Sequence, residues 1–171
     1  MELTSALEKI AQDQAGDAFY RLESEPSCTD DFRFFVNADC ITLVVSVKSM
    51  GEGVVSHTFA SHPIVTTTEA YRELISFCNA LNRLEEQSLG KFVVDGYNLT
   101  YQSYCPEAIL EADPKKAQKF LFVEGVRLWS SLAMAILLVS RAQWSSRKAE
   151  GYVREIYHRG IPDYDGVPRA R

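Results

Sequence analysis

Hydrophobic and polar residues alternate along three neighbouring segments in the first part of the chain, residues 31–37, 41–48 and 54–60. In the clearest of them the apolar positions are Ile41, Leu43, Val45 and Val47. Strict alternation between turn residues predicts antiparallel strands that bury one face of a sheet. A further, weaker strand is predicted at residues 18–23.

Two segments show helical spacing instead. Leu3, Leu7 and Ile10 predict a short amphipathic helix that ends near Gly16. A threonine at positions 66–68 can cap the free N–H groups of a longer helix that closes near Gly90. The predicted apolar stripe of this second helix consists of Tyr71, Leu74, Ile75, Cys78 and Leu81.

The second half of the chain predicts a hairpin and then a long helix. Strands at 91–94 and 99–104 flank an Asp95-Gly96 turn, and Asp113-Pro114 opens the long final helix. The order is α, three or four β, α, two β, α, which predicts an α+β fold with helices packed on an antiparallel sheet. We divide the chain into an α+β domain, residues 1–144, and a C-terminal segment, residues 145–171. The segment is predicted to contain a helix at about 146–158, followed by an irregular tail.

The charge of the chain indicates which kinds of partner it can bind. The net charge of -5 disfavours nucleic acid, because phosphate contacts need clustered Lys and Arg. Residues 141–171 differ from the rest, with seven Lys and Arg against four Asp and Glu. This basic segment is interpreted either as a solvated helix face and tail or as a contact for an acidic partner.

The segment 120–140 is long and apolar enough to raise the question of a membrane. It contains Glu124 and Arg127 one turn apart, and charges near a bilayer centre are unfavourable. We therefore predict a buried core helix and keep a membrane-attached protein as an alternative. The N-terminus lacks a signal-peptide pattern, and the four cysteines form no CxxC, so a cytoplasmic protein is expected.

Residues that carry catalysis or bind metals are sparse. His57, His62 and His158 have no partner at a spacing typical of a nucleophile–base pair or a metal site, and no phosphate-binding loop is present. We expect no catalytic residue, no metal and no cofactor. The alternative is an enzyme whose site is assembled from scattered residues, with Asp31, His57 and Tyr101 as candidates.

The final helix carries more apolar surface than one sheet can cover, because its apolar residues occur on nearly all sides. The remainder is covered either by the C-terminal helix around Trp144, Tyr152 and Ile156, folded back onto it, or by a second subunit or partner. The predicted partner-binding residues are Phe122, Val126, Trp129, Met134 and Trp144.

The stretch from Glu69 to about Ile136 resembles the YbjN family of bacterial sensory-transduction-regulator-like proteins. The matching features are an Asn-x-x-Asn helix end at Asn79 and Asn82, the strand start Gly90-Lys91-Phe92, the Asp95-Gly96 hairpin and the apolar helix. The chain departs from the pattern in its Ser88-Leu89 step and in the tail after Arg141. We interpret Asn79 and Asn82 as hydrogen-bonding residues of the helix end and hairpin rather than as a ligand site.

The resemblance implies a fold similar to type III secretion chaperones, in which homodimers bind extended segments of client proteins. It implies no known catalytic residue. We therefore expect a non-catalytic, chaperone-like or regulatory protein-binding module that acts as a homodimer and binds neither nucleic acid nor membrane.

Overall fold

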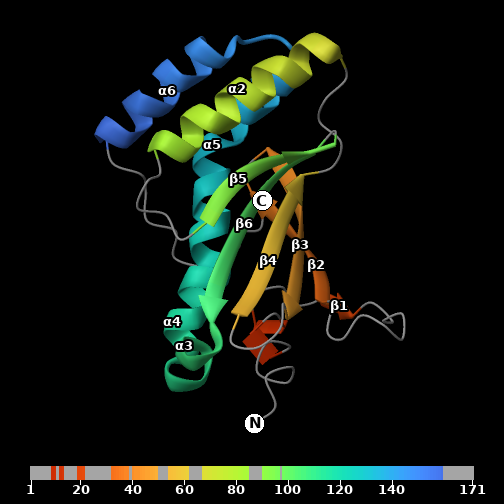
Figure 1. Ribbon diagram of the computed structural model, residues 1–171, viewed down its shortest axis with the longest axis vertical. Coiled ribbons are helices and arrows are strands. Elements are labelled where there is room, and N and C mark those ends of the chain that lie inside the picture. Colours follow the sequence, from red (N-terminus) through yellow and green to blue (C-terminus); the bar gives the residue numbers. More distant parts are fainter. Residues whose placement is uncertain are drawn as a thin grey trace.

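A six-stranded antiparallel sheet carries a long helix on one face (Figure 1). The computed structural model describes residues 9–10, 12–13, 19–21, 32–38, 40–49, 54–61, 67–84, 90–96 and 98–159. The strands are β1 (Phe19–Arg21), β2 (Phe32–Ala38), β3 (Ile41–Ser49), β4 (Val54–Ser61), β5 (Gly90–Asp95) and β6 (Asn98–Pro106). The helical elements are α2 (Thr68–Leu84), α3 (Glu107–Ala112), α4 (Pro114–Gln118), the π-helical turn η2 (Lys119–Val123), α5 (Glu124–Ser140) and α6 (Ser146–Arg159).

The strand order is β1-β2-β3-β4-β6-β5, so the second strand of the β5–β6 hairpin lies inside the sheet and the first forms its edge. One register row runs across five strands as Phe34, Val45, Phe59, Tyr101 and Phe92. Val45, Tyr101 and Phe92 are buried, which identifies this row with the helix-covered face. The adjacent row, which includes the exposed Phe35 and Val93, belongs to the opposite face, which we call the open face.

The predicted alternation of β3 is confirmed, since Ile41, Leu43, Val45 and Val47 are buried while the intervening positions are more exposed. All predicted strands appear within one or two residues of their expected ends. The α+β class and the antiparallel sheet are therefore confirmed. Most of the expected first helix lies outside the described residues, although residues 9–10 and 12–13 are helical and Ile10 is buried.

Helix α2 begins at a threonine cap, as predicted. The Ala70 N–H donates to the Thr67 hydroxyl oxygen at 3.1 Å. Leu74, Cys78 and Leu81 of the predicted stripe are buried, whereas Tyr71 is half-buried and Ile75 is exposed, and Phe77 is buried instead. The buried residues are Ala70, Leu74, Phe77, Cys78, Ala80 and Leu81.

The long final helix is continuous from Pro114 to Ser140 through α4, η2 and α5. Its start is capped by Asp113, whose carboxylate accepts the Lys116 N–H at 3.0 Å. By length and composition this helix is able to cross a membrane, but 56% of its most apolar window is buried inside the protein. It is a core helix of this fold. The short helix α3 before it was not predicted.

Three layers result (Figure 1). Helix α5 lies on β2 and β3, and η2 lies on β6. Helices α2 and α6 lie side by side across the C-terminal half of α5, and both contact it. The described core is therefore a single cluster that joins the sheet, α2, α5 and α6.

Gly90 permits a close approach in this core. A Cβ placed there would lie 2.4 Å from the Tyr101 ring carbon Cζ and 2.6 Å from the Gln102 carbonyl oxygen. Tyr101 is fully buried against Phe92, with ring centroids 5.0 Å apart, so its ring has little room to retreat. Only a residue without a side chain fits at the start of β5.

We predict that Gly90→Ala destabilises the protein by about 1–3 kcal/mol, because it overpacks the Tyr101 ring and the neighbouring strand. Gly151→Ala is the matched control, since nothing lies within 4 Å of a Cβ at this position in α6. The control should raise stability by about 0.5–1 kcal/mol through helix propensity. Urea unfolding measures both, and equal effects of the two variants would contradict the prediction.

Candidate functional site

The five predicted partner-binding residues occupy three different environments. Phe122, Val126 and Trp129 are buried in the core and present no surface to a partner in this fold. Met134 is exposed at 44% on α5. Trp144 is half-buried in the connection that follows α5. The structure does not bring these residues together as one surface.

One stripe of α5 is less buried than the rest of the helix. Its exposed or half-buried positions recur at helical spacing. We define the outer stripe as Arg127, Ser130, Ser131, Met134, Leu137 and Leu138. The first turn of this stripe is polar, since Arg127 pairs with Glu124 at 2.5 Å. The part around Met134 is apolar, with Met134 exposed and Leu137 and Leu138 half-buried.

Helix α6 covers another part of the apolar surface of α5. Ala149 and Val153 are fully buried and lie one turn apart on the face that contacts α2 and α5. The C-terminal helix therefore folds back onto the core, which was one of the two arrangements left open by the sequence. It does not cover the outer stripe.

A carboxylate on α2 holds the first turn of α6. The Ser146 backbone N–H donates to Glu73 Oε2 at 2.5 Å, so Glu73 meets the positive end of the helix dipole. This backbone hydrogen bond lowers the pKa of the Glu73 carboxyl below its ordinary value. The contact links residues 73 positions apart and fixes where α6 starts on α2.

The basic residues of α6 are solvated. Arg154 pairs with Glu150 at 2.7 Å and Arg159 with Glu155 at 3.6 Å, both along the helix surface. Surface ion pairs of this kind contribute little. The exposed Lys148 ammonium lies 4.7 Å from the centroid of the Trp144 ring. The positive charge of this segment thus lies on the outer face of α6.

The free edge of β5 is closed by α2 at Phe92. The Phe92 N–H donates to Asn82 Oδ1 and the Asn82 amide N–H donates to the Phe92 carbonyl oxygen, each at 2.7 Å. The Asn82 side chain thereby replaces the backbone of a neighbouring strand. The prediction that Asn82 bonds the hairpin is confirmed, whereas Asn79, one turn earlier on α2, is exposed.

Cys78 lies one turn before Asn82, and its thiol also donates to the Phe92 carbonyl oxygen at 3.0 Å. Burial raises the pKa of this thiol to about 11, although the Val94 backbone N–H acts in the opposite direction. Burial likewise raises the pKa of the Cys105 thiol. Both thiols are protonated at neutral pH and are poor nucleophiles.

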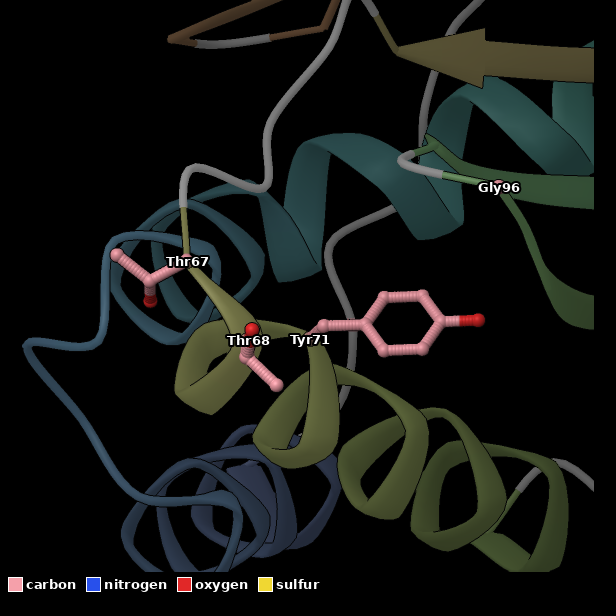
Figure 2. Close-up of a pocket in the computed structure, with 4 residues that line it drawn as sticks. All are labelled: Thr67, Thr68, Tyr71 and Gly96. Atoms are coloured by element: carbon pink, nitrogen blue, oxygen red, sulfur yellow. The ribbon is translucent and has the colours of Figure 1, made fainter.

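A pocket of about 340 Å³ lies between the start of α2 and the β5–β6 turn, lined by Thr67, Thr68, Tyr71 and Gly96. Figure 2 shows the Tyr71 ring projecting from α2 toward the turn that carries Gly96. The Thr67 hydroxyl already serves as the cap of α2. Tyr71 is the one acid–base side chain among these four residues, so they form no nucleophile–base pair.

Of the three candidate residues of the enzyme alternative, the structure describes the side chain of one, Tyr101. Tyr101 is buried against Phe92 and Gly90. Asp31 and the side chain of His57 lie outside the described part of the structure. Among the described residues, no group of three or more His, Cys, Asp or Glu side chains is placed to hold a metal ion.

Comparisons with protein-family models, with curated proteins and with solved structures return no match to this chain. The resemblance to the YbjN family therefore stays a prediction. The structure does explain the residues that carry it, because Asn82, Gly90 and Phe92 all act in closing and packing the edge strand.

We predict that Asn82→Ala lowers the free energy of unfolding by about 2 kcal/mol, because two hydrogen bonds to Phe92 are lost at about 1 kcal/mol each. Asn79→Ala is the matched control on the same helix and should change stability by less than about 0.5 kcal/mol. Urea unfolding measures both. A difference of less than about 0.5 kcal/mol between the variants would show that Asn82 does not hold β5.

A second prediction concerns pH. Because the folded-state pKa of Glu73 is lowered, its contribution to stability is fully present above the ordinary pKa of 4.5 and is lost as pH falls through the folded-state pKa. The stability difference between wild type and Glu73→Gln should therefore be largest at neutral pH and vanish in acid. Thermal unfolding across this range measures it. Glu155→Gln, which breaks only an exposed pair, should show a much smaller difference at every pH.

Proposed function

We propose that the chain is a non-catalytic protein-binding module, chaperone-like or regulatory, that works as a homodimer in the cytoplasm. The observation that carries the proposal is the apolar part of the outer stripe of α5, where Met134 is exposed and Leu137 and Leu138 are half-buried, while the sheet, α2 and α6 contact other parts of the helix. An apolar surface that the chain's own elements leave uncovered is typical of a contact for another protein.

The chemistry of such a contact is that of an apolar anchor. Met134 is the exposed residue of the apolar part of the stripe, and the half-buried Leu137 and Leu138 follow it one turn later on α5. A flexible thioether side chain adapts to differently shaped partners, as at surfaces that bind several clients. The polar pair Glu124–Arg127 bounds the surface at one end and Arg141 at the other.

The edge of β5 is a poor place for an extended client. Asn82 and Cys78 occupy the outward-facing backbone groups of Phe92, so a strand added there would have to displace α2. This favours side-chain recognition on α5 over strand addition at this edge. Cys40, Cys78 and Cys105 are free thiols, which supports the proposal of a reducing compartment.

The proposal is tested by substituting the anchor. Met134→Lys should weaken capture of the partner by at least about tenfold relative to wild type, because an ammonium group replaces the apolar side chain that is most exposed on this surface. Tyr104→Lys is the matched control, since Tyr104 is exposed to a similar degree, 46%, on the open face of the sheet. Affinity capture from a bacterial lysate with quantitative mass spectrometry measures both.

Retained capture with Met134→Lys would contradict the proposed surface. Loss with Tyr104→Lys alone would move the partner to the open sheet face, where Phe35 and Val93 are also exposed. Thermal unfolding confirms that each variant is folded. Light scattering tests the homodimer, and a monomer at all concentrations would contradict that part.

A further inference from the structure

The connection between α5 and α6 contains a strained residue. Ala142 has φ = 56°, and among the described residues it is the one non-glycine with a positive φ. In this left-handed region the Cβ of an L-residue crowds the following carbonyl oxygen, and a non-β-branched residue such as Ala tolerates it less well than Gly. Ala142 is exposed, so no tertiary packing of its side chain offsets the strain.

This residue ends α5. The Ala142 N–H donates to the Val139 carbonyl at 2.9 Å, and the N–H groups of Gln143 and Trp144 donate to the Leu138 carbonyl. Such an ending usually has glycine at the left-handed position. If Ala142 took a right-handed helical conformation instead, α5 would continue toward α6. The connecting residues 141–145 contain neither Gly nor Pro to prevent it.

The side chain that follows the bend already belongs to α6. The Trp144 ring lies 5.4 Å from the Tyr152 ring and close to the Lys148 ammonium. Lys148 is four residues further on, so a continuous helix would keep Trp144 and Lys148 as neighbours one turn apart. Straightening the bend therefore carries Trp144 along with α6.

Released from its groove, α6 has little stability of its own. It has 14 residues, and isolated helices of that length are marginal in water. Its two fully buried residues, Ala149 and Val153, need the groove between α2 and α5. An identical groove is present on every other copy of the chain.

We infer that α6 is exchanged between two copies of this chain. In the exchanged dimer α5 and α6 form one continuous helix, and each α6 occupies the α2–α5 groove of the other copy. The inference rests on the homodimer part of the proposed function and specifies how that dimer is held together. It leaves the outer stripe of α5 free for a client.

Two contacts oppose the exchange. In a continuous helix the Ser146 N–H would donate to the Ala142 carbonyl, so the contact with Glu73 would be lost. The Ser145 hydroxyl would also cease to cap α6 at the Lys148 N–H. Relief of the strain at Ala142 and a high protein concentration favour the exchanged dimer.

Position 142 tests the inference without touching the groove. Asn and Thr have similar helix propensities and sizes, but Asn tolerates the left-handed conformation whereas β-branched Thr does not. Ala142→Thr should dimerise at least about fivefold more tightly than Ala142→Asn. Ala142→Gly, which both relieves the bend and disfavours a continuous helix, should dimerise about thirtyfold more weakly than wild type.

Size-exclusion chromatography with light scattering from low micromolar to near-millimolar protein gives the dimerisation constants, and circular dichroism confirms folding of each variant. Exchange is supported if Ala142→Thr dimerises more tightly than Ala142→Asn and Ala142→Gly dimerises more weakly than wild type. A dimer of equal strength in all variants overturns exchange but leaves the proposed homodimer intact. Monomers throughout the series overturn both, whereas capture through Met134 is tested independently of this outcome.

Discussion

Helix α5 has to be buried on more sides than a sheet provides, and the other helices are arranged to meet that demand. Trp129, Leu132 and Ile136 are fully buried within it. Each such side chain contributes roughly 1.5–3 kcal/mol when removed from water, so leaving a second side of the helix exposed would be unfavourable. The sheet covers one side, and α2 and α6 cover another. The outer stripe around Met134 is the less buried part of α5, and we propose that a partner binds there because Met134 is exposed.

Phe92 connects the layers that surround α5. Its ring packs edge-on against Trp129 at 5.7 Å and against Tyr101 at 5.0 Å, while its backbone is held by Asn82. One residue of an edge strand is thus fixed from the sheet, from α2 and from α5. Three of the residues that carry the resemblance to the YbjN family, Asn82, Gly90 and Phe92, belong to this arrangement. They describe how an edge strand is closed, and for that reason they bear on the fold rather than on a ligand.

Helix α6 is the element that we infer to pack either on its own copy or on another copy of the chain. Its buried residues pack between α2 and α5. The connection from α5 contains the strained Ala142, and the first turn of α6 is held by the Glu73 carboxylate on α2. The C-terminal helix, a second copy of the chain and a client protein are therefore able to contact different parts of the apolar surface of α5. The chain's own helix fills one part of the surface, a second copy is able to supply that helix, and a client would occupy the outer stripe.

The sequence by itself determined the elements of this protein to within a few residues. Strands with one buried face alternate visibly, and local chemistry marks the ends, as with the Thr67 and Asp113 caps and the Gly96 turn. It did not determine α3 or the choice of Phe77 over Ile75 in the core. Nor could it separate the buried Trp129 from the exposed Met134. In a helix that is apolar all round, periodicity does not say which side faces solvent. Only the packing of α2, α6 and the sheet against α5 decides that.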